Sequence, residues 1–222
     1  MIMLIKNINH RFDFKDSTIN RLVIENSAEW RNILTKLQRQ ILFGEEFLML
    51  FDDLKELNVP KNVEVIYSPI DFSPNQTRFL SKLYKDLAED CVQGEKMLET
   101  MEIKGKIAEF VGNLIFDKEM SLMQSEDFDV IGLFKLTGVK FEDRDGDMLS
   151  KILDFMLAVQ ELEGDKIFIF VGLSDFISID EKDVFYDTII SKKIKLLLLD
   201  RNVYGKHQSE KLIIIDHDLC EI

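Results

Sequence analysis

The sequence has 222 residues, of which 46% are hydrophobic, and a formal net charge of −13. This length suits one elaborated domain or a domain with a large insertion. No apolar run reaches the roughly 18 residues that a membrane helix needs, and the first residues lack the basic start of a signal peptide. We therefore expect a cytoplasmic protein with no membrane contact. Cys91 and Cys220 predict neither a disulfide nor a zinc site.

The negative charge argues against nucleic acid as a partner, because a DNA duplex is a dense polyanion. An acidic surface most often serves solubility. Two arrangements would still admit DNA. Basic side chains can gather on one face, or bound cations can neutralise the carboxylates.

The first third of the chain predicts strands around one helix. Asn26 or Ser27 can cap this helix, whose apolar residues recur at helical spacing until Gly44. Pro60 breaks the chain before the last strand of this region. The expected strands are residues 11–15, 21–24, 47–51 and 63–67.

The middle of the chain, from residue 75 to about 136, predicts helices and no convincing strand. Two apolar stripes at helical spacing favour a hairpin of long antiparallel helices that bury their stripes against each other. Gly94 or Gly105 would lie near the turn. A third helix is expected over residues 127–136, and residues 138–142 fit a short strand.

Two continuous apolar runs organise the C-terminal part, residues 166–173 and 195–200. Strands that are apolar on both faces must be covered on both faces, which is typical of parallel sheets. The connection between the runs is long enough for a crossover helix, so we expect a strand–helix–parallel strand unit. Asp145 or Asp147 can cap a preceding helix that ends near Gly164, and a last strand is expected at residues 211–216.

These elements predict an α/β fold in which both ends of the chain form a head with a mainly parallel sheet. A helical leg is inserted in the middle. The expected boundaries are residues 1–73 and 137–222 for the head and 74–136 for the leg.

Residues 196–200, four leucines and Asp200, match the second acidic motif of P-loop nucleotide hydrolases, whose aspartate holds magnesium beside the phosphates. The glycine-rich partner motif, G-x-x-x-x-G-K-[ST], is absent from the sequence, so no backbone loop is expected to cradle a phosphate. Many buried strands also end in aspartate. A metal-dependent nuclease or nucleotide hydrolase that uses Asp200 is the alternative to a protein without catalytic residues.

A carboxylate-rich stretch lies at the expected junction of leg and head. Oxygen ligands at irregular spacing suit calcium, which tolerates flexible coordination by about six to eight oxygens. The same stretch can instead be a solvated helix end with a cap at Asp127. The candidate calcium ligands are Asp117, Glu119, Glu126, Asp127 and Asp129.

Lysines cluster in short segments that most often are simply solvated. A closed oligomer could still collect them around a central opening, because symmetry multiplies every lysine by the number of subunits. The candidate DNA-binding residues are Lys104, Lys106, Lys192, Lys193 and Lys195.

Three stretches together carry a resemblance to a known family: residues 65–75 (VIYSPIDFSPN), residues 133–142 (LFKLTGVKFE) and the apolar runs 166–171 and 196–201. With the matching order of head, leg and head, the chain resembles the small CRISPR-associated adaptation protein of type II-A systems, the Csn-two family. The resemblance covers most of the chain and is weakest over the first forty residues.

The resemblance implies a ring-shaped homotetramer whose α/β head is similar to an ATPase core without nucleotide-binding motifs. It implies non-catalytic, sequence-independent binding of double-stranded DNA inside the ring, chiefly at free ends. Calcium near the junction of head and leg would support the ring. The implied partners are the CRISPR integrase complex and the type II effector nuclease, and the implied role is acquisition of new spacers.

Overall fold

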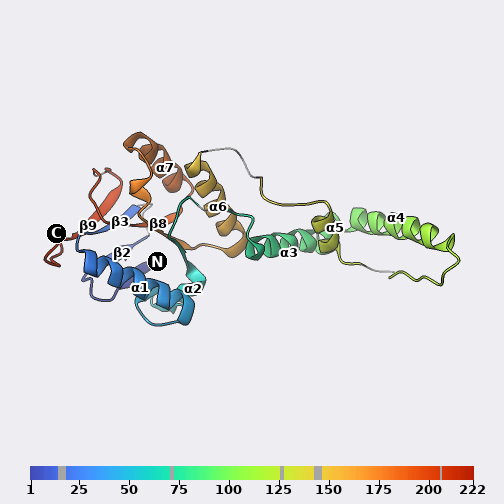
Figure 1. The fold of residues 1–222 in the computed structure, drawn as a ribbon, viewed down its shortest axis with the longest axis horizontal. Coiled ribbons are helices and arrows are strands. Elements are labelled where there is room, and N and C mark those ends of the chain that lie inside the picture. The colour runs from blue at the N-terminus through green and yellow to red at the C-terminus, as the bar shows by residue number, and fades with distance from the viewer. Residues whose placement is uncertain (15–18, 71–72, 126–127, 143–146, 206) are drawn as a thin grey trace. The chain divides into compact units, whose positions relative to one another are not determined.

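The computed structural model describes residues 1–14, 19–70, 73–125, 128–142, 147–205 and 207–222 (Figure 1). The chain divides into two compact units. Met1–Phe72 and Asp145–Ile222 form an α/β unit, and Ser73–Arg144 form a helical unit. No helix in the described part of the chain is both long and apolar enough to cross a membrane.

The α/β unit centres on a five-stranded parallel sheet. Every residue of β7 is buried, and so is every residue of β8 except the first. The predicted strand–helix–parallel strand unit is confirmed, because β7 and β8 are parallel neighbours and α7 (Ile179–Ser191) connects them. The strand order is β6 (Val63–Ile66), β7 (Ile167–Val171), β8 (Lys195–Asp200), β3 (Ile19–Ile24) and β9 (Glu210–Ile215).

A separate antiparallel sheet contains the other described strands of this unit. The sequence predicts strands at residues 11–15 and 47–51, but it does not predict that they belong to a second, antiparallel sheet. The reason is visible in β1, which lies between β2 and β4 and pairs antiparallel with both. The order is β2 (Arg11–Asp13), β1 (Ile2–Ile5), β4 (Leu48–Asp52) and β5 (Lys55–Leu57).

One hydrophobic cluster joins the two sheets through α1 (Ser27–Phe43). It includes Leu50 of the antiparallel sheet, Ile33 of α1 and Ile169 of the parallel sheet. Because side chains alternate along a strand, Phe168 faces the other side, where it makes an edge-to-face ring contact with Phe155 from α6 (Met148–Glu163). Helices α6 and α7 cover this second face (Figure 1). The parallel sheet is therefore buried on both sides.

Residues predicted from the sequence fix both ends of α1. Asn26 accepts hydrogen bonds from two backbone N–H groups of the first turn, and Gly44 ends the helix with a φ of 73°. The buried side chain of Gln40 then ties the helix to β4, since its amide donates to the Leu48 carbonyl at 2.8 Å and accepts from the Leu48 N–H at 2.6 Å. Asn58 caps α2 (Val59–Asn62), the short helix that contains Pro60. Asp147 and Gly164 bound α6, also as predicted.

The helical unit contains α3 (Thr77–Gln93), α4 (Met97–Phe116) and α5 (Val130–Leu136). The prediction that the helices of a hairpin bury their stripes against each other is wrong, since α4 buries none of its residues. Figure 1 draws α4 beyond the end of α3 instead of alongside it. Gly94 lies at the break between them, whereas Gly105 lies inside α4.

The segment after α5 is irregular, so the predicted strand at residues 138–142 is also wrong. A side chain replaces the expected strand pairing, because Asn75 accepts a hydrogen bond from the Phe141 N–H at 2.9 Å. The hydroxyl of Tyr84 donates to the Val139 carbonyl at 2.8 Å. These contacts hold residues 139–141 to Asn75 before α3 and to the first half of that helix. The helical unit extends past the expected boundary at residue 136.

Candidate functional site

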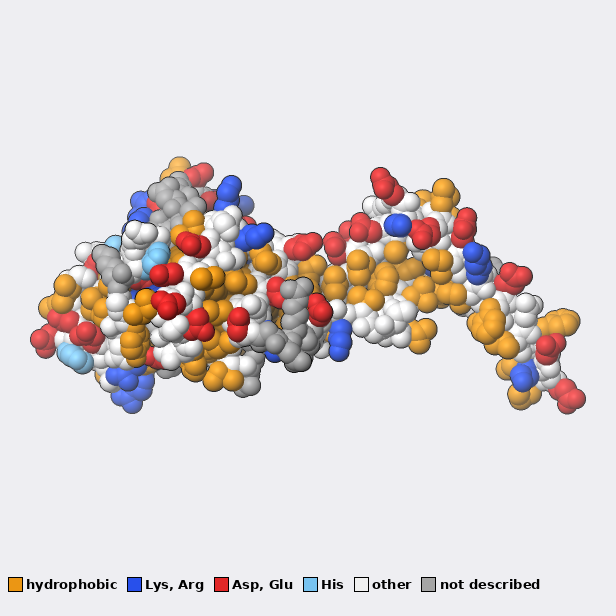
Figure 2. Space-filling model, turned by 90° about the horizontal axis from the view of Figure 1, so that it is seen from above, with side chains coloured by type: hydrophobic (Ala, Val, Ile, Leu, Met, Phe, Trp, Pro, Cys, Tyr) orange, Lys and Arg blue, Asp and Glu red, His pale blue; other side chains and the backbone are white. Residues whose placement is uncertain are grey.

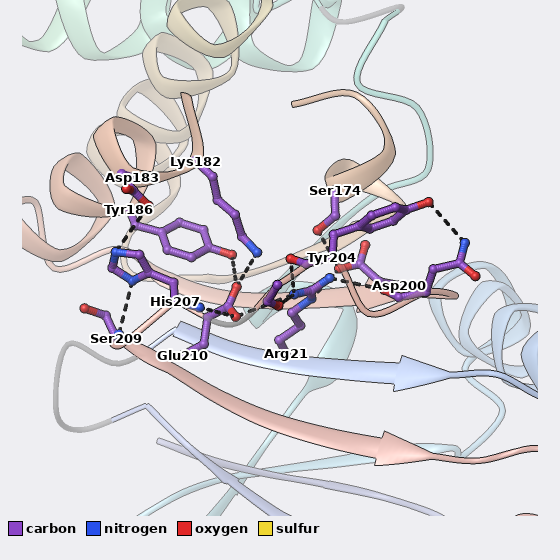
Figure 3. Close-up of polar contacts among 12 residues, drawn as sticks. Arg21, Ser174, Lys182, Asp183, Tyr186, Asp200, Tyr204, His207, Ser209 and Glu210 are labelled. Atoms are coloured by element: carbon purple, nitrogen blue, oxygen red, sulfur yellow. Dashed lines mark hydrogen bonds and ion pairs between the residues drawn. The ribbon is translucent and has the colours of Figure 1, made fainter. Parts of the chain in front are cut away.

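A buried network of charged side chains lies between the parallel sheet and α7 (Figure 3). Strands β3, β8 and β9 supply Arg21, Asp200 and Glu210, and α7 supplies Lys182 and Tyr186. Each of these five residues is at most 5% exposed. Two cations and two carboxylates balance each other, which is the condition under which charges can be buried without a large penalty.

Arg21 connects this network to the segment between β8 and β9, which the structure describes over residues 201–205 and 207–209. Its Nε lies 2.7 Å from Oδ2 of Asp200, and the Ser174 hydroxyl donates to the same oxygen at 2.6 Å. The guanidinium also donates to the backbone carbonyls of Asn202 (3.2 Å), Gly205 (3.1 Å) and Tyr204 (3.4 Å). One buried arginine therefore fixes residues 202–205, which belong to no helix or strand.

Glu210 is the second anionic centre of the network. Lys182 Nζ lies 2.7 Å from its Oε1, and the Tyr186 hydroxyl donates to that oxygen. The backbone N–H of His207 donates to Oε2 at 3.1 Å. Burial works to raise the pKa of Glu210, but these hydrogen bonds and the Lys182 charge outweigh it and hold the pKa below its usual value. Burial and the Glu210 carboxylate raise the pKa of Tyr186.

Two helix N-termini next to the sheet are capped by side chains of their own segment. Strand β3 passes into α1 through Glu25 and Asn26 alone, and the Asn26 side chain accepts from two first-turn N–H groups. Ser178 and Glu181 form a reciprocal capping box at the start of α7. A phosphate cradle needs free backbone N–H groups in this position, so neither helix start has the form of a nucleotide-binding loop.

The predicted calcium ligands do not form a cluster among the described residues. Asp117 follows the last turn of α4, and Glu119 is exposed. Asp129 caps α5: its carboxylate accepts from the Ile131 N–H at 3.0 Å. Glu126 and Asp127 lie outside the described residues. Within the described ranges, no three His, Cys, Asp or Glu side chains gather in a way that could hold a metal ion.

The predicted DNA-binding lysines differ in their surroundings. Lys104 lies over the ring of Phe128, with Nζ 5.4 Å from the ring centre, whereas Lys106 is exposed. Lys192 and Lys193 are exposed at the C-terminal end of α7, where positive charge also favours the helix dipole. Lys195 forms an ion pair with Asp165, so its charge is already largely compensated.

Sequence reasoning found Asp200 but missed its partners. Arg21 and Glu210 stand directly beside apolar strand residues, and neither was predicted to belong to a site. A signal was available, because a charged residue within or next to a fully buried strand must find a partner of opposite charge. The partner's identity was not readable, since Arg21 and Asp200 are 179 positions apart.

Comparison with known proteins decides the family. A family model described as "CRISPR-associated protein (Cas_Csn2)" matches residues 40–219. The chain belongs to the Csn2 family. A protein of Enterococcus faecalis named "CRISPR-associated protein Csn2" is 24% identical over 163 residues, which cover 72% of this chain and 73% of that relative.

The resemblance predicted from the sequence is thus confirmed, and the Csn2-family chain is CRISPR-associated. The family match includes Asp200, Glu210 and every candidate lysine and carboxylate. It begins inside α1, so β3 and its Arg21 precede it. This agrees with the weaker likeness of the first forty residues, and it means that a network residue lies outside the matched part of the chain.

Proposed function

We propose that this Csn2-family protein is a ring-shaped homotetramer that binds double-stranded DNA ends without reading their sequence and without catalysis. Its role would be the acquisition of CRISPR spacers, together with the integrase complex and the effector nuclease of the same locus. The observation that carries the proposal is the family match over residues 40–219. A closed ring accepts DNA by threading an end, which accounts for a preference for ends without any catalytic residue.

The helical unit supports assembly into an oligomer. Large apolar side chains along α4 remain in water in the single chain: Leu98 is 74% exposed, Phe110 64% and Leu114 53%. Several large apolar side chains left exposed along one helix are typical of a surface that contacts another protein. In the proposed ring, another copy of the chain would cover these side chains.

The exposed lysines support a sequence-independent mode of binding. Contacts to phosphates position DNA but carry no sequence information. Lys106, Lys192 and Lys193 are exposed and long enough to make such contacts, and Lys104 would present its ammonium from the surface of Phe128. Assembly multiplies these few charges and collects them, whereas a single chain of charge −13 offers little to a polyanion.

Calcium is proposed as a structural ion, with ligands drawn from Asp117, Glu119, Glu126, Asp127 and Asp129. In the isolated chain Asp129 already caps a helix with one carboxylate oxygen, which leaves the other oxygen for a cation. Calcium would reduce repulsion among carboxylates that assembly brings together. Solution mass with calcium and with a chelator tests this: a tetramer that persists unchanged after chelation would remove calcium from the proposal.

The alternative is an enzyme that uses Asp200, and one observation speaks for it. Asp200 Oδ1 is buried and accepts no hydrogen bond from the part of the chain that the structure describes. The other oxygen of Asp200 is engaged by Arg21 and Ser174, which favours a structural role.

One experiment separates the two functions. Linear and covalently closed circular duplexes of equal length are incubated with the protein and calcium or magnesium, and retention and integrity are measured. Retention of linear DNA alone, with the DNA intact, is expected. Equal retention of both forms would exclude a threaded ring, and degradation with magnesium would favour the enzyme.

A further inference from the structure

A groove separates the N-terminal halves of α6 and α7 on the outer side of the α/β unit. Its volume is about 340 Å³. Its walls are apolar and come from both helices, while carboxylates from the first turns of the helices stand at one end. The apolar lining residues are Leu149, Leu153, Val184 and Phe185, and the acidic ones are Asp147, Asp180 and Glu181.

The groove lies on an exposed surface that is both apolar and acidic. Val184 at its edge is 69% exposed, and Ile179 at the start of α7 is equally exposed. Asp183 and Asp187 add further exposed carboxylates along the same helix. Figure 2 looks onto the face that α6 and α7 cover, and there hydrophobic side chains are flanked by Asp and Glu. Covering apolar area that is left in water in this way favours association with a partner.

We propose that the α6/α7 groove binds a basic amphipathic helix of a partner protein. Aliphatic side chains at i, i+3 and i+4 of such a helix would enter between Leu153 and Val184. Its Lys and Arg side chains would meet the carboxylates of Asp180 and Glu181, which sets orientation and speeds association.

Charge excludes the two other occupants considered for this surface. A DNA backbone would meet carboxylates instead of lysines at the rim. A second copy cannot pair its own α6/α7 groove with this one, because two sets of rim carboxylates would repel each other across the contact. The docking therefore concerns a basic protein segment and does not depend on DNA binding.

The test uses a fluorescent synthetic helix of about 18 leucine and lysine residues, with leucines on one face, and measures anisotropy on titration with the full chain. The same helix with glutamate in place of lysine is the probe control. Val184→Glu places a charge in the groove and should weaken binding of the lysine helix at least about tenfold. Leu54→Glu introduces the same charge at a side chain that is 99% exposed and lies outside the groove, and it should change nothing.

A second variant, with its own control, tests the proposal even if Val184→Glu does not fold. Asp180→Lys reverses a rim charge and should also weaken the lysine helix, whereas Asp187→Lys, on the same helix but outside the groove, should have much less effect. Equal binding by Val184→Glu and Leu54→Glu would overturn the proposal. A lower solution mass of unbound Val184→Glu would overturn it in favour of a contact between copies. Loss of duplex retention by Val184→Glu alone would overturn it in favour of DNA.

Discussion

The Nε of Arg21 on β3 lies 2.7 Å from Oδ2 of Asp200 on β8, and the two residues are 0% and 1% exposed. Asp200 is the aspartate of the motif that resembles the second acidic motif of P-loop nucleotide hydrolases. Arg21 lies on β3, which precedes the part of the chain that the family model matches. Where a nucleotide hydrolase would keep this aspartate free for a metal ion, here Arg21 and Ser174 engage its Oδ2, and Oδ1 accepts no hydrogen bond within the described part of the chain. The same arginine holds residues 202–205 against the sheet.

Removing Arg21 should destabilise the fold strongly. Arg21→Met leaves Asp200 buried and unpaired, which costs about 3–5 kcal/mol in comparable buried pairs. The double variant Arg21→Met with Asp200→Asn should lose less than the sum of the two single losses, because the unpaired charge is gone. Urea unfolding of the two single variants and the double variant measures this coupling.

A surface pair gives the matched comparison. Arg39 lies 3.0 Å from Glu45, and both side chains are more than half exposed. Arg39→Met should therefore cost only about 0–1 kcal/mol. If Arg21→Met were as mild as Arg39→Met, the buried pair would not hold the sheet and its crossover segment together.

Glu210 should make the protein sensitive to acid. Its pKa is lower in the folded state than the usual 4.5, so on acidification the unfolded state takes up this proton first. The stability that Glu210 contributes is present above about pH 4.5 and is lost as the pH falls through the folded pKa.

Glu210→Gln should therefore lower stability at neutral pH and flatten its decline in acid. The glutamine leaves Lys182 without its buried anion, so the loss at pH 7 should be about 3–5 kcal/mol. Urea midpoints measured between about pH 3 and pH 7 test this. Curves of wild type and variant that stay parallel down to the lowest pH would assign the acid sensitivity to other carboxylates.

The helix α1 should depend on its asparagine cap. Asn26→Ala removes the acceptor for two first-turn N–H groups and also the bond from Nδ2 to the His217 carbonyl at 2.8 Å. A loss of about 1–2 kcal/mol is expected, with Asn26→Ser closer to wild type because serine also caps. Thermal unfolding compares the two variants, and a loss as large for serine as for alanine would place the effect in the His217 contact.

The parallel core could be predicted from the sequence because its signals are local. Continuous apolar runs indicated β7 and β8, and the caps Asn26, Gly44 and Asp147 are single residues with one strong conformational preference. The antiparallel sheet could not be assigned, since a short apolar strand does not reveal which strand it will pair with. The pairing of Arg21 with Asp200 is non-local for the same reason.

In the helical unit, the sequence predicted a helix correctly but not what that helix contacts. The apolar stripe of α4 was correctly predicted to be helical, but periodicity says only that one face will be covered and not by what. The neighbouring helix was the expected cover, but no residue of α4 is fully buried, and Ile103 and Leu114 of the stripe are exposed. The candidate calcium ligands carry the same ambiguity, because a carboxylate at a helix start, such as Asp129, serves equally as a cap.

The lysines at the end of α7 should contribute to DNA binding through charge alone. Lys192→Gln combined with Lys193→Asn removes two exposed charges, and asparagine tolerates the φ of 55° at position 193. Affinity for linear duplex should fall, and the slope of log K against log salt should become shallower by about one unit for each phosphate that is no longer neutralised. Filter retention over a range of salt concentrations measures both quantities.

Two further substitutions show whether position matters more than net charge. Lys195→Gln should have a smaller effect, because Asp165 already pairs with that ammonium. Lys55→Gln removes an exposed lysine from the edge strand of the antiparallel sheet and is the matched charge control. A salt slope that falls equally for Lys55→Gln would mean that the overall charge of the chain governs the affinity. A slope that is unchanged by the loss of Lys192 and Lys193 would mean that DNA binds to another surface of the protein.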